Sequence, residues 1–258
     1  MTGTDSPAAP DTPLDPLDPL DNVVWHSLIG PRSHLAERRG RAARFDPEVS
    51  IFAAVDDGAT PQAWDDLADL LGPGGVAVLG RRSLRVPSDW AVQMEVAGVQ
   101  MVAGADLDVT VPGEVVPQPL GPDDVDDMMS LIAATDPGPF ERRTVEIGGY
   151  LGVRSGGKLV AMAGERFRCP GYTEISAVCT DAEFRGRGLG SLLTRAVAAQ
   201  IRSRGDEAFL HAAASNTNAI RLYEALGFTL RTTCDFAAVR RISDGKRPAG
   251  DPPSLHGR

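Results

Sequence analysis

The sequence predicts an α/β (α+β) protein made of two domains. Short runs rich in β-branched and apolar residues alternate with longer segments whose apolar residues recur at helical spacing. This pattern indicates strands and helices that follow one another along the chain. A proline-rich stretch at residues 112–122 excludes a helix and breaks any central strand, so it divides the chain into two parts. At 258 residues, the chain is long enough for a sizeable core in each part.

The first predicted domain, residues 23–115, opens with a helix that contains Trp25 and Leu28. An arginine-rich segment follows at residues 38–44. It could bind an anion, but a solvated helix face paired with Asp46 and Glu48 is the favoured interpretation. The remaining expected elements are a strand at 50–55, a helix at 61–71, a strand at 76–79 and paired strands at 91–102. No catalytic motif lies in this domain.

The second predicted domain, residues 116–242, begins with a helix at 123–134 whose acidic first turn suits the helix dipole. Its expected strands lie at 144–153, 158–167, 172–180 and 207–213, with a hairpin turn at 155–157 between the first two. A helix at 216–226 and a last strand or pair of strands at 228–241 complete it. The flanking residues 1–22 and 243–258 are rich in Asp, Pro or Gly and are predicted to be disordered tails.

The composition narrows the classes of partner and the compartment. A net charge of −9 and a pI near 5.0 argue against nucleic acid or an anionic membrane, and mildly favour a cationic partner. No apolar run approaches the length of a bilayer span, and no basic then apolar leader follows Met1, so we expect a cytoplasmic protein. The three cysteines lack metal-ligand spacing, which predicts reduced thiols and no metal site.

The most informative segment joins the strand at 172–180 to the amphipathic helix that follows it. Gly186, Gly188 and Gly190 leave the backbone bare, so consecutive N–H groups can point at one phosphate while the helix start adds its positive end. Arg185 and Arg187 add positive charge suited to a diphosphate. The spacing is neither a P-loop nor a dinucleotide fingerprint, and reads R-x-x-G-x-G.

A second signature, N-x-x-A-x-x-L-Y-x-x-x-G-F, runs from Asn216 through Tyr223 to Phe228. With these two motifs in this order, residues 116–241 resemble the GCN5-related N-acetyltransferase (GNAT) family. The resemblance implies a mixed, mainly antiparallel sheet flanked by helices, acetyl-CoA as co-substrate and no metal. It also raises the hypothesis that the smaller first domain is a degenerate copy of the same fold.

The resemblance also implies which residues bind the coenzyme. The loop and the start of its helix would hold the diphosphate, and backbone N–H groups at the end of the preceding strand would hold the pantetheine arm as if it were an extra strand. The set implied by the family is Val178, Cys179, Thr180, Arg185, Gly186, Arg187, Gly188, Leu189, Gly190, Ser191 and Asn216. Asn216 is also expected to cap its helix. Where the family often has a proline before the loop, this chain has Asp181 and Ala182.

Two catalytic roles are predicted. An alkylammonium with a pKa of about 10.4 is almost wholly protonated at pH 7, so a general base is useful. Glu174 is the candidate base, with Glu165 and His211 as alternatives. Tyr223 is the candidate acid, because its phenol could donate a proton to the leaving thiolate; a core role for this aromatic is the alternative.

These residues predict an N-acetyltransferase that moves an acetyl group from acetyl-CoA to a primary amine by direct attack. A non-catalytic acyl-CoA-binding regulatory module and a transferase of longer acyl groups are the alternatives. Tyr223 favours an enzyme, since diphosphate binding alone would not require it. The acceptor, a small molecule or a protein amine, and the oligomeric state are left open by the sequence.

Overall fold

The computed structural model describes residues 18–111, 113 and 115–242. The helices are α1 (Val23–Ile29), α2 (Pro61–Leu71), α3 (Val125–Thr135), α4 (Leu189–Ser203) and α5 (Thr217–Leu226). The strands are β1 (Ala36–Arg39), β2 (Ala42–Phe45), β3 (Ala53–Val55), β4 (Val76–Arg81), β5 (Trp90–Ala103), β6 (Gln118–Leu120), β7 (Tyr150–Ser155), β8 (Lys158–Cys169), β9 (Tyr172–Thr180), β10 (Glu207–Ala213) and β11 (Phe228–Arg241). Short 3-10 helices lie between some of these elements.

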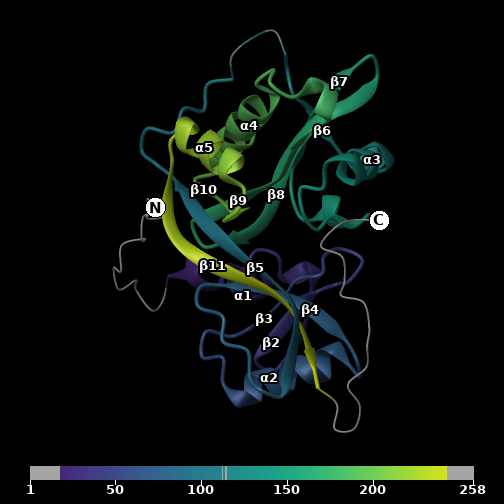
Figure 1. The fold of residues 1–258 in the computed structure, drawn as a ribbon, viewed down its shortest axis with the longest axis vertical. Helices are drawn as coiled ribbons and strands as arrows, with labels where there is room; N and C mark the ends of the chain where they lie inside the picture. The colour runs from purple at the N-terminus through teal and green to yellow at the C-terminus, as the bar shows by residue number, and fades with distance from the viewer. Residues whose placement is uncertain (1–17, 112, 114, 243–258) are drawn as a thin grey trace, which may run out of the picture.

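Most strands belong to one eight-stranded sheet of order β4-β11-β5-β10-β9-β8-β7-β6. Its neighbours are antiparallel except β9 and β10, which run parallel. A separate three-stranded sheet of order β1-β2-β3 lies in the lower half of the molecule, beside α1 and α2 (Figure 1). The mixed, mainly antiparallel sheet flanked by helices, with a second smaller sheet, confirms the predicted fold class.

The long strands β5 and β11 join the two halves of the molecule. They pair from Phe228↔Ala103 to Arg241↔Trp90, and Figure 1 shows them running from the half that holds α4 and α5 into the half that holds α2. The large sheet is therefore continuous across the proline-rich stretch at 112–122. The division into domains 23–115 and 116–242 stays a prediction, but strands from both segments build one sheet.

Helices cover both faces of the large sheet. On one face, α4 packs against β7, β8, β9 and β10 through an apolar stripe that includes Leu193, Val197 and Ile201. On the other face, α3 packs against β8 and β9 through Met128 and Ile132, and α1 packs against β8. The helical spacing of these side chains in the sequence is what places each stripe against the sheet.

Several element predictions are confirmed and others are wrong. The bounds of α2 and β9 are those expected, and Thr60 caps α2 ahead of Pro61. Residues 91–102 lie in one long strand rather than a pair, and residues 228–241 form a single strand, which is one of the two arrangements expected there. Gly98 lies inside β5 and not in a turn between two strands. A Cβ there would come within 3.0 Å of the Phe236 ring and of Cys234 Sγ, so the close packing of β11 favours glycine at this position. Residues 144–146 form a 3-10 helix, so the strand expected from Thr144 begins at Tyr150.

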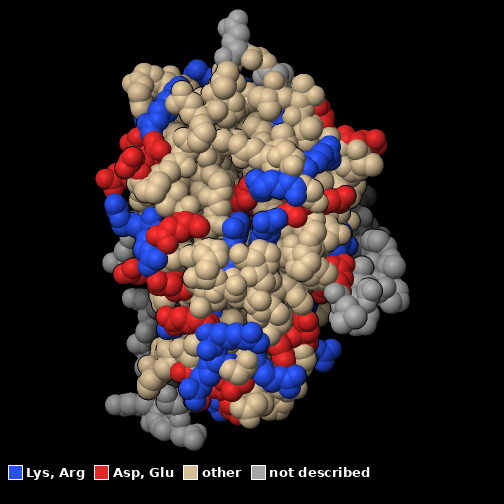
Figure 2. Space-filling model, turned by 180° about the vertical axis from the view of Figure 1, so that it is seen from behind, with Lys and Arg blue, Asp and Glu red and all other residues tan. Residues whose placement is uncertain are grey.

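The arginine-rich segment is a β-hairpin rather than a helix, and its charges are paired as expected but with other partners. Three contacts join Arg39 to Asp69 (2.7 Å), Arg41 to Asp56 (2.6 Å) and Arg44 to Glu37 (2.6 Å). Asp46 and Glu48 instead contact Arg143. Figure 2 shows basic and acidic side chains interspersed over the face seen from behind. Such pairing leaves this segment little free positive charge for an anion.

The predicted amino-terminal tail is too long. Residues 19–22 form a 3-10 helix in which Leu20 and Asn22 are buried, and Asp18 contacts Arg231 at 2.6 Å. The rest of that tail and residues 243–258 lie outside the described residues. Within the part of the chain that the structure describes, no helix has the length and apolar character needed to cross a membrane.

Candidate active site

The two parallel strands β9 and β10 separate part-way along their length. Their pairing runs from Tyr172↔Glu207 to Ile175↔Leu210. Beyond that point β9 stays paired with β8 and β10 with β5. A cavity of about 350 Å³ opens there, with walls that include Ser176, Val178 and His211. One edge of each strand is thus available to an extended ligand.

A β-bulge shapes the β9 wall of this cavity. Ser176 pairs with Gly164 and Cys179 with Met162, so Ala177 and Val178 oppose a single residue of β8. Ala177 has φ of 52°, a left-handed conformation that is rare for a residue with a Cβ. Bulges of this kind bend a strand and redirect its side chains. Here the bulge lies where β9 turns away from β10, and Val178 lines the cavity.

The glycine loop ends at the start of α4. Gly186 and Gly188 have φ of 75° and 76°, and a Cβ at either position would meet no protein atom within 4 Å. The Leu192 N–H donates to the Gly188 carbonyl at 3.0 Å, so the N–H groups of Leu189, Gly190 and Ser191 precede the helical ladder. The helix has no side-chain cap at Gly188. Bare backbone, open space and the dipole of a 15-residue helix coincide here, as an anion site requires.

The loop adjoins the cavity. A Cβ on Gly190 would lie 4.0 Å from Val178 Cγ1, so the first turn of α4 reaches the cavity wall. Arg185 and Arg187 are exposed, and each donates to a carbonyl of the loop, Arg185 to Thr180 (3.3 Å) and Arg187 to Glu183 (3.2 Å). Cys179 is buried on the α3 side of the sheet, so only its backbone faces this region.

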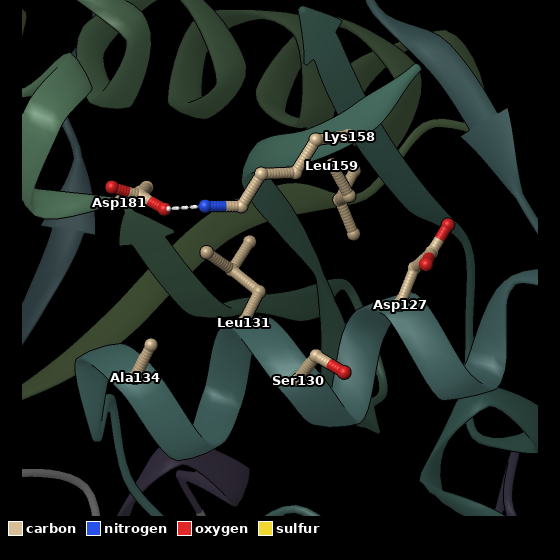
Figure 3. A pocket seen from close by; sticks show the side chains of 7 residues that line it. All are labelled: Asp127, Ser130, Leu131, Ala134, Lys158, Leu159 and Asp181. Carbon is tan, nitrogen blue, oxygen red and sulfur yellow. Dashed lines mark hydrogen bonds and ion pairs between the residues drawn. The ribbon is translucent and has the colours of Figure 1, made fainter. Parts of the chain in front are cut away.

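Asp181 fixes the turn that precedes the glycine loop. Its carboxylate accepts from the Glu183 N–H (3.0 Å) and from Lys158 Nζ (2.6 Å), and its own N–H donates to the Val160 carbonyl (2.8 Å). Figure 3 shows Lys158 reaching Asp181 across a small pocket of about 110 Å³ above α3. The Lys158 ammonium and the Glu183 N–H lower the pKa of Asp181 below its ordinary value. An ion pair and a capped turn thus anchor the start of the loop.

Tyr223 and Asn216 both line the cavity from the α5 side. The Tyr223 ring packs edge-on against Phe228, and its side chain is nearly buried. Burial, with a smaller contribution from Cys179, raises the pKa of Tyr223 to about 12, so its hydroxyl keeps its proton at neutral pH. Asn216 Oδ1 accepts from the Ala219 N–H at 3.1 Å, which confirms the predicted helix cap. This position of Tyr223 is compatible both with a packing role in the core and with a role as proton donor in the cavity.

Glu174 lies behind the cavity wall. Its side chain is fully buried, and its carboxylate accepts from Arg166 Nε (2.8 Å), Arg166 Nη2 (2.7 Å) and His211 Nδ1 (2.7 Å). Burial alone would raise the pKa of Glu174, but Arg166 and His211 outweigh it and lower that pKa to about 2. Arg166 and His211, and not Glu174, line the cavity.

The tautomer of His211 follows from its neighbours. Gln100 Oε1 must accept from Arg231 (2.7 Å), and Gln100 Nε2 must donate to the Leu20 carbonyl (2.9 Å), which fixes the amide orientation. The same Nε2 lies 3.1 Å from His211 Nε2, which therefore accepts. The proton of the neutral ring is then on Nδ1, where it is donated to Glu174.

The chain is similar in sequence and fold to known proteins. The model of the FR47-like protein family matches residues 150–237. A putative acetyltransferase of the GNAT family from Novosphingobium aromaticivorans is 38% identical, with a TM-score of 0.78, over 87% of this chain and 99% of that chain. The chain belongs to the GNAT acetyltransferase family.

Two further known proteins are similar to this GNAT protein. A GCN5-related N-acetyltransferase from Kribbella flavida, 20% identical with a TM-score of 0.57 over 79% of this chain and 88% of that one, shares the fold. A mycothiol acetyltransferase from Thermobispora bispora is 52% identical over 63 residues, which is 24% of this chain and 21% of that relative. The match thus spans about a fifth of that curated relative. The similarity to the acetyltransferase from Novosphingobium aromaticivorans covers 87% of this chain. It therefore extends beyond residues 116–241, which contain the sequence motifs.

The alternative bases of this GNAT protein differ in their surroundings. Glu165 contacts Arg204 (2.7 Å) and Arg32 (3.7 Å) and is not among the residues that line the cavity. His211 lines the cavity, but both of its ring nitrogens have partners. Glu174 as general base stays a prediction, one that a pKa of about 2 makes unfavourable. Among the described residues, no three His, Cys, Asp or Glu side chains form a metal-binding group.

Proposed function

We propose that this GNAT protein transfers the acetyl group of acetyl-CoA to a primary amine by direct attack of the amine. One observation supports this most: β9 and β10 separate after Ile175 and Leu210, and the resulting cavity lies beside the glycine loop and contains Tyr223. An extended thiol arm could lie along the free edge of β9 while its diphosphate rests on the loop.

When bound, acetyl-CoA supplies the acyl thioester. The N–H groups of Leu189, Gly190 and Ser191 would bind the diphosphate, with Arg185 and Arg187 adding charge. Backbone N–H groups between Val178 and Thr180 would orient the arm, and one of them would stabilise negative charge developing on the carbonyl oxygen. As the amine nitrogen bonds to the carbonyl carbon and the carbon–sulfur bond breaks, Tyr223 would donate its proton to the sulfur.

The amine must lose a proton during the reaction. A carboxylate whose pKa is about 2 accepts a proton poorly, so in this proposal Glu174 holds Arg166 and His211 in place. The amine proton then leaves through the open cavity to water. A general-base role for Glu174 predicts a different dependence of rate on pH, with a loss in Glu174→Gln that shrinks in alkaline solution.

Thiol release from acetyl-CoA across a panel of amines tests the function. The panel contains an alkylamine, an amino acid, an amino-acid amide, a polyamine and a lysine-containing peptide. Amine-dependent thiol release would support the enzyme. Tight coenzyme binding with no release for any amine would support the regulatory module instead. Faster release from butyryl-CoA than from acetyl-CoA would support transfer of a longer acyl group.

Replacing Tyr223 with phenylalanine is expected to lower kcat by about 10²-fold, because the ring still packs while the proton donor is lost. The KM for acetyl-CoA and the melting temperature should change little. Tyr172→Phe, at the far end of β9 and outside the cavity lining, is the matched control and should keep wild-type kcat. Full activity of Tyr223→Phe would mean that Tyr223 has a packing role and does not donate the proton.

A further inference from the structure

Arg166 presents a fixed donor edge to the cavity. Its Nε and Nη2 atoms are occupied by Glu174, and its guanidinium carbon lies 5.0 Å from the Phe52 ring centre and 4.5 Å from that of Phe167. These contacts set the plane and direction of the group. The side chain is 12% exposed and lines the cavity. A guanidinium has five N–H donors, so among the described residues the edge bearing Nη1 is left for a ligand.

This edge lies on the side of the cavity away from the glycine loop. The loop follows Thr180, at one end of β9, whereas the Arg166 contact is at Glu174, six residues earlier. At about 3.3 Å per residue, the two points are on the order of 20 Å apart along the strand. The strands separate between them, at Ile175. A thioester carried by a coenzyme on the loop would therefore meet its acceptor near Arg166.

The apolar walls near Arg166 come from the first part of the chain and from β11. Phe52, Val78, Val96 and Phe236 line the same cavity. Phe52 and Phe236 contact each other edge-on, with ring centres 6.2 Å apart, and Phe236 also contacts His211. The residues before the proline-rich stretch thus supply much of the acceptor side of the cavity. An aliphatic or aromatic group of the acceptor would gain by burial there.

The charge at this edge is already balanced. Glu174 is fully buried and ionised, so Arg166 and Glu174 together carry no net charge. A second carboxylate on Arg166 would be desolvated beside Glu174, and like charges at short range in a protein interior repel strongly. A neutral oxygen accepts the same hydrogen bond without that repulsion. The edge is therefore suited to a carbonyl rather than to a carboxylate.

We propose that Arg166 forms an acceptor subsite that binds a neutral carbonyl oxygen next to the reacting amine, with an apolar group of the acceptor against Phe52 and Phe236. The acceptor class is an α-amino amide, as in an amino-acid amide. This inference deepens the proposed N-acetyltransferase function and rests on it.

A matched acceptor series tests the subsite. Leucinamide carries the amine, the neutral carbonyl and an isobutyl group; 3-methylbutylamine lacks the carboxamide; leucine has a carboxylate in its place. The kcat/KM of each acceptor is measured by thiol release for the wild type and for Arg166→Lys, which keeps the positive charge but loses the planar fork. Dividing the leucinamide/3-methylbutylamine ratio of the wild type by that of the variant cancels the different basicity of the two amines.

We expect that quotient to be about tenfold, the usual effect of one hydrogen bond to a charged group. Leucine should be a poorer substrate than leucinamide for the wild type once each kcat/KM is expressed per unprotonated amine, because the two amines differ in basicity. A quotient of one, or leucine equal to leucinamide, would overturn the subsite while leaving the transferase function in place. Because Arg166→Lys could unfold, its melting temperature is measured first, and the wild-type comparison of leucine with leucinamide needs no variant.

Ligand-observed NMR separates this inference from the proposed function. The three amines are titrated into protein saturated with coenzyme A. Preferential binding of leucinamide without thiol release from acetyl-CoA would overturn the transferase function and support the subsite. Equal binding of all three amines, with no thiol release, would overturn both.

Discussion

Replacing Gly188 with valine is expected to weaken coenzyme A binding by about 10³-fold, the loss of roughly two charge-assisted hydrogen bonds. Gly188 has φ of 76°, and a Cβ there would meet no protein atom within 4 Å. The new side chain would therefore project into open space beside the first N–H groups of α4, where the diphosphate is proposed to lie. Isothermal titration calorimetry with coenzyme A measures the change.

The same helix provides the control. Gly205, just after the carboxyl end of α4, has φ of 83° and equally open surroundings. Gly205→Val should carry a similar backbone cost, of about 1–3 kcal/mol, but it lies at the opposite end of the helix from the loop. Equal melting temperatures with loss of binding only in Gly188→Val would support the loop as the coenzyme site. Unchanged affinity for coenzyme A in a folded Gly188→Val protein would contradict the assignment of the glycine loop as the coenzyme site.

The parts of the site that the sequence predicts are local in the chain. The glycine loop, the helix that starts at Leu189 and the capped helix at 217–226 depend on residues within a few positions of one another. Their geometry follows from backbone freedom, helix periodicity and capping, which act over short distances. No pattern within the strands predicts the opening between β9 and β10; the resemblance to the GNAT family implied only that the end of β9 would hold an extended arm.

The remaining features depend on contacts between distant segments. Glu174 and His211 are 37 positions apart, and Gln100 and His211 are 111 positions apart. A carboxylate on a strand has no local signal that distinguishes a free base from one paired with an arginine on the neighbouring strand. The insertion of β5 between β11 and β10 is likewise set by pairing across the molecule, so no local pattern predicts that a strand of the first segment joins the strands of the second in one sheet.

Glu174→Gln is expected to lower the free energy of unfolding by about 3–5 kcal/mol, because it leaves the buried Arg166 without its counter-charge. The amide also places an NH₂ group against donors, since Arg166 and His211 both donate to the carboxylate. Urea unfolding at pH 7 measures the loss. Stability equal to the wild type would mean that the pair is replaceable.

A second arginine–glutamate pair in the chain is the control. Arg143 and Glu146 make the same two-point contact, with Nε–Oε1 at 2.7 Å and Nη2–Oε2 at 2.9 Å, but both side chains are about 40% exposed. Glu146→Gln should therefore cost no more than about 1 kcal/mol. The difference between the two variants isolates the effect of burial from that of the contact geometry.

The loss of stability in Glu174→Gln should depend on pH in a definite direction. Although burial opposes ionisation, Arg166 holds the pKa of Glu174 at about 2, below its ordinary value of about 4.3. The stability contributed by the ionised carboxylate is thus fully present above about pH 4.5 and is lost as the pH falls towards 2. The gap between the wild type and the variant should be constant from pH 7 to pH 5 and should narrow below that. A gap that stays constant down to pH 3 would contradict the lowered pKa.

The rate of the same variant distinguishes the two roles of Glu174. A positioning role predicts that Glu174→Gln lowers kcat/KM by a similar factor at every pH from 6 to 10, because Arg166 and His211 are displaced whatever the charge of the amine. A general-base role predicts a loss that is largest near neutral pH and shrinks in alkaline solution, where the amine loses its proton unaided. With a pKa of about 2 and both carboxylate oxygens hydrogen-bonded, we expect the uniform loss. Recovery of the rate at alkaline pH would restore Glu174 as the base.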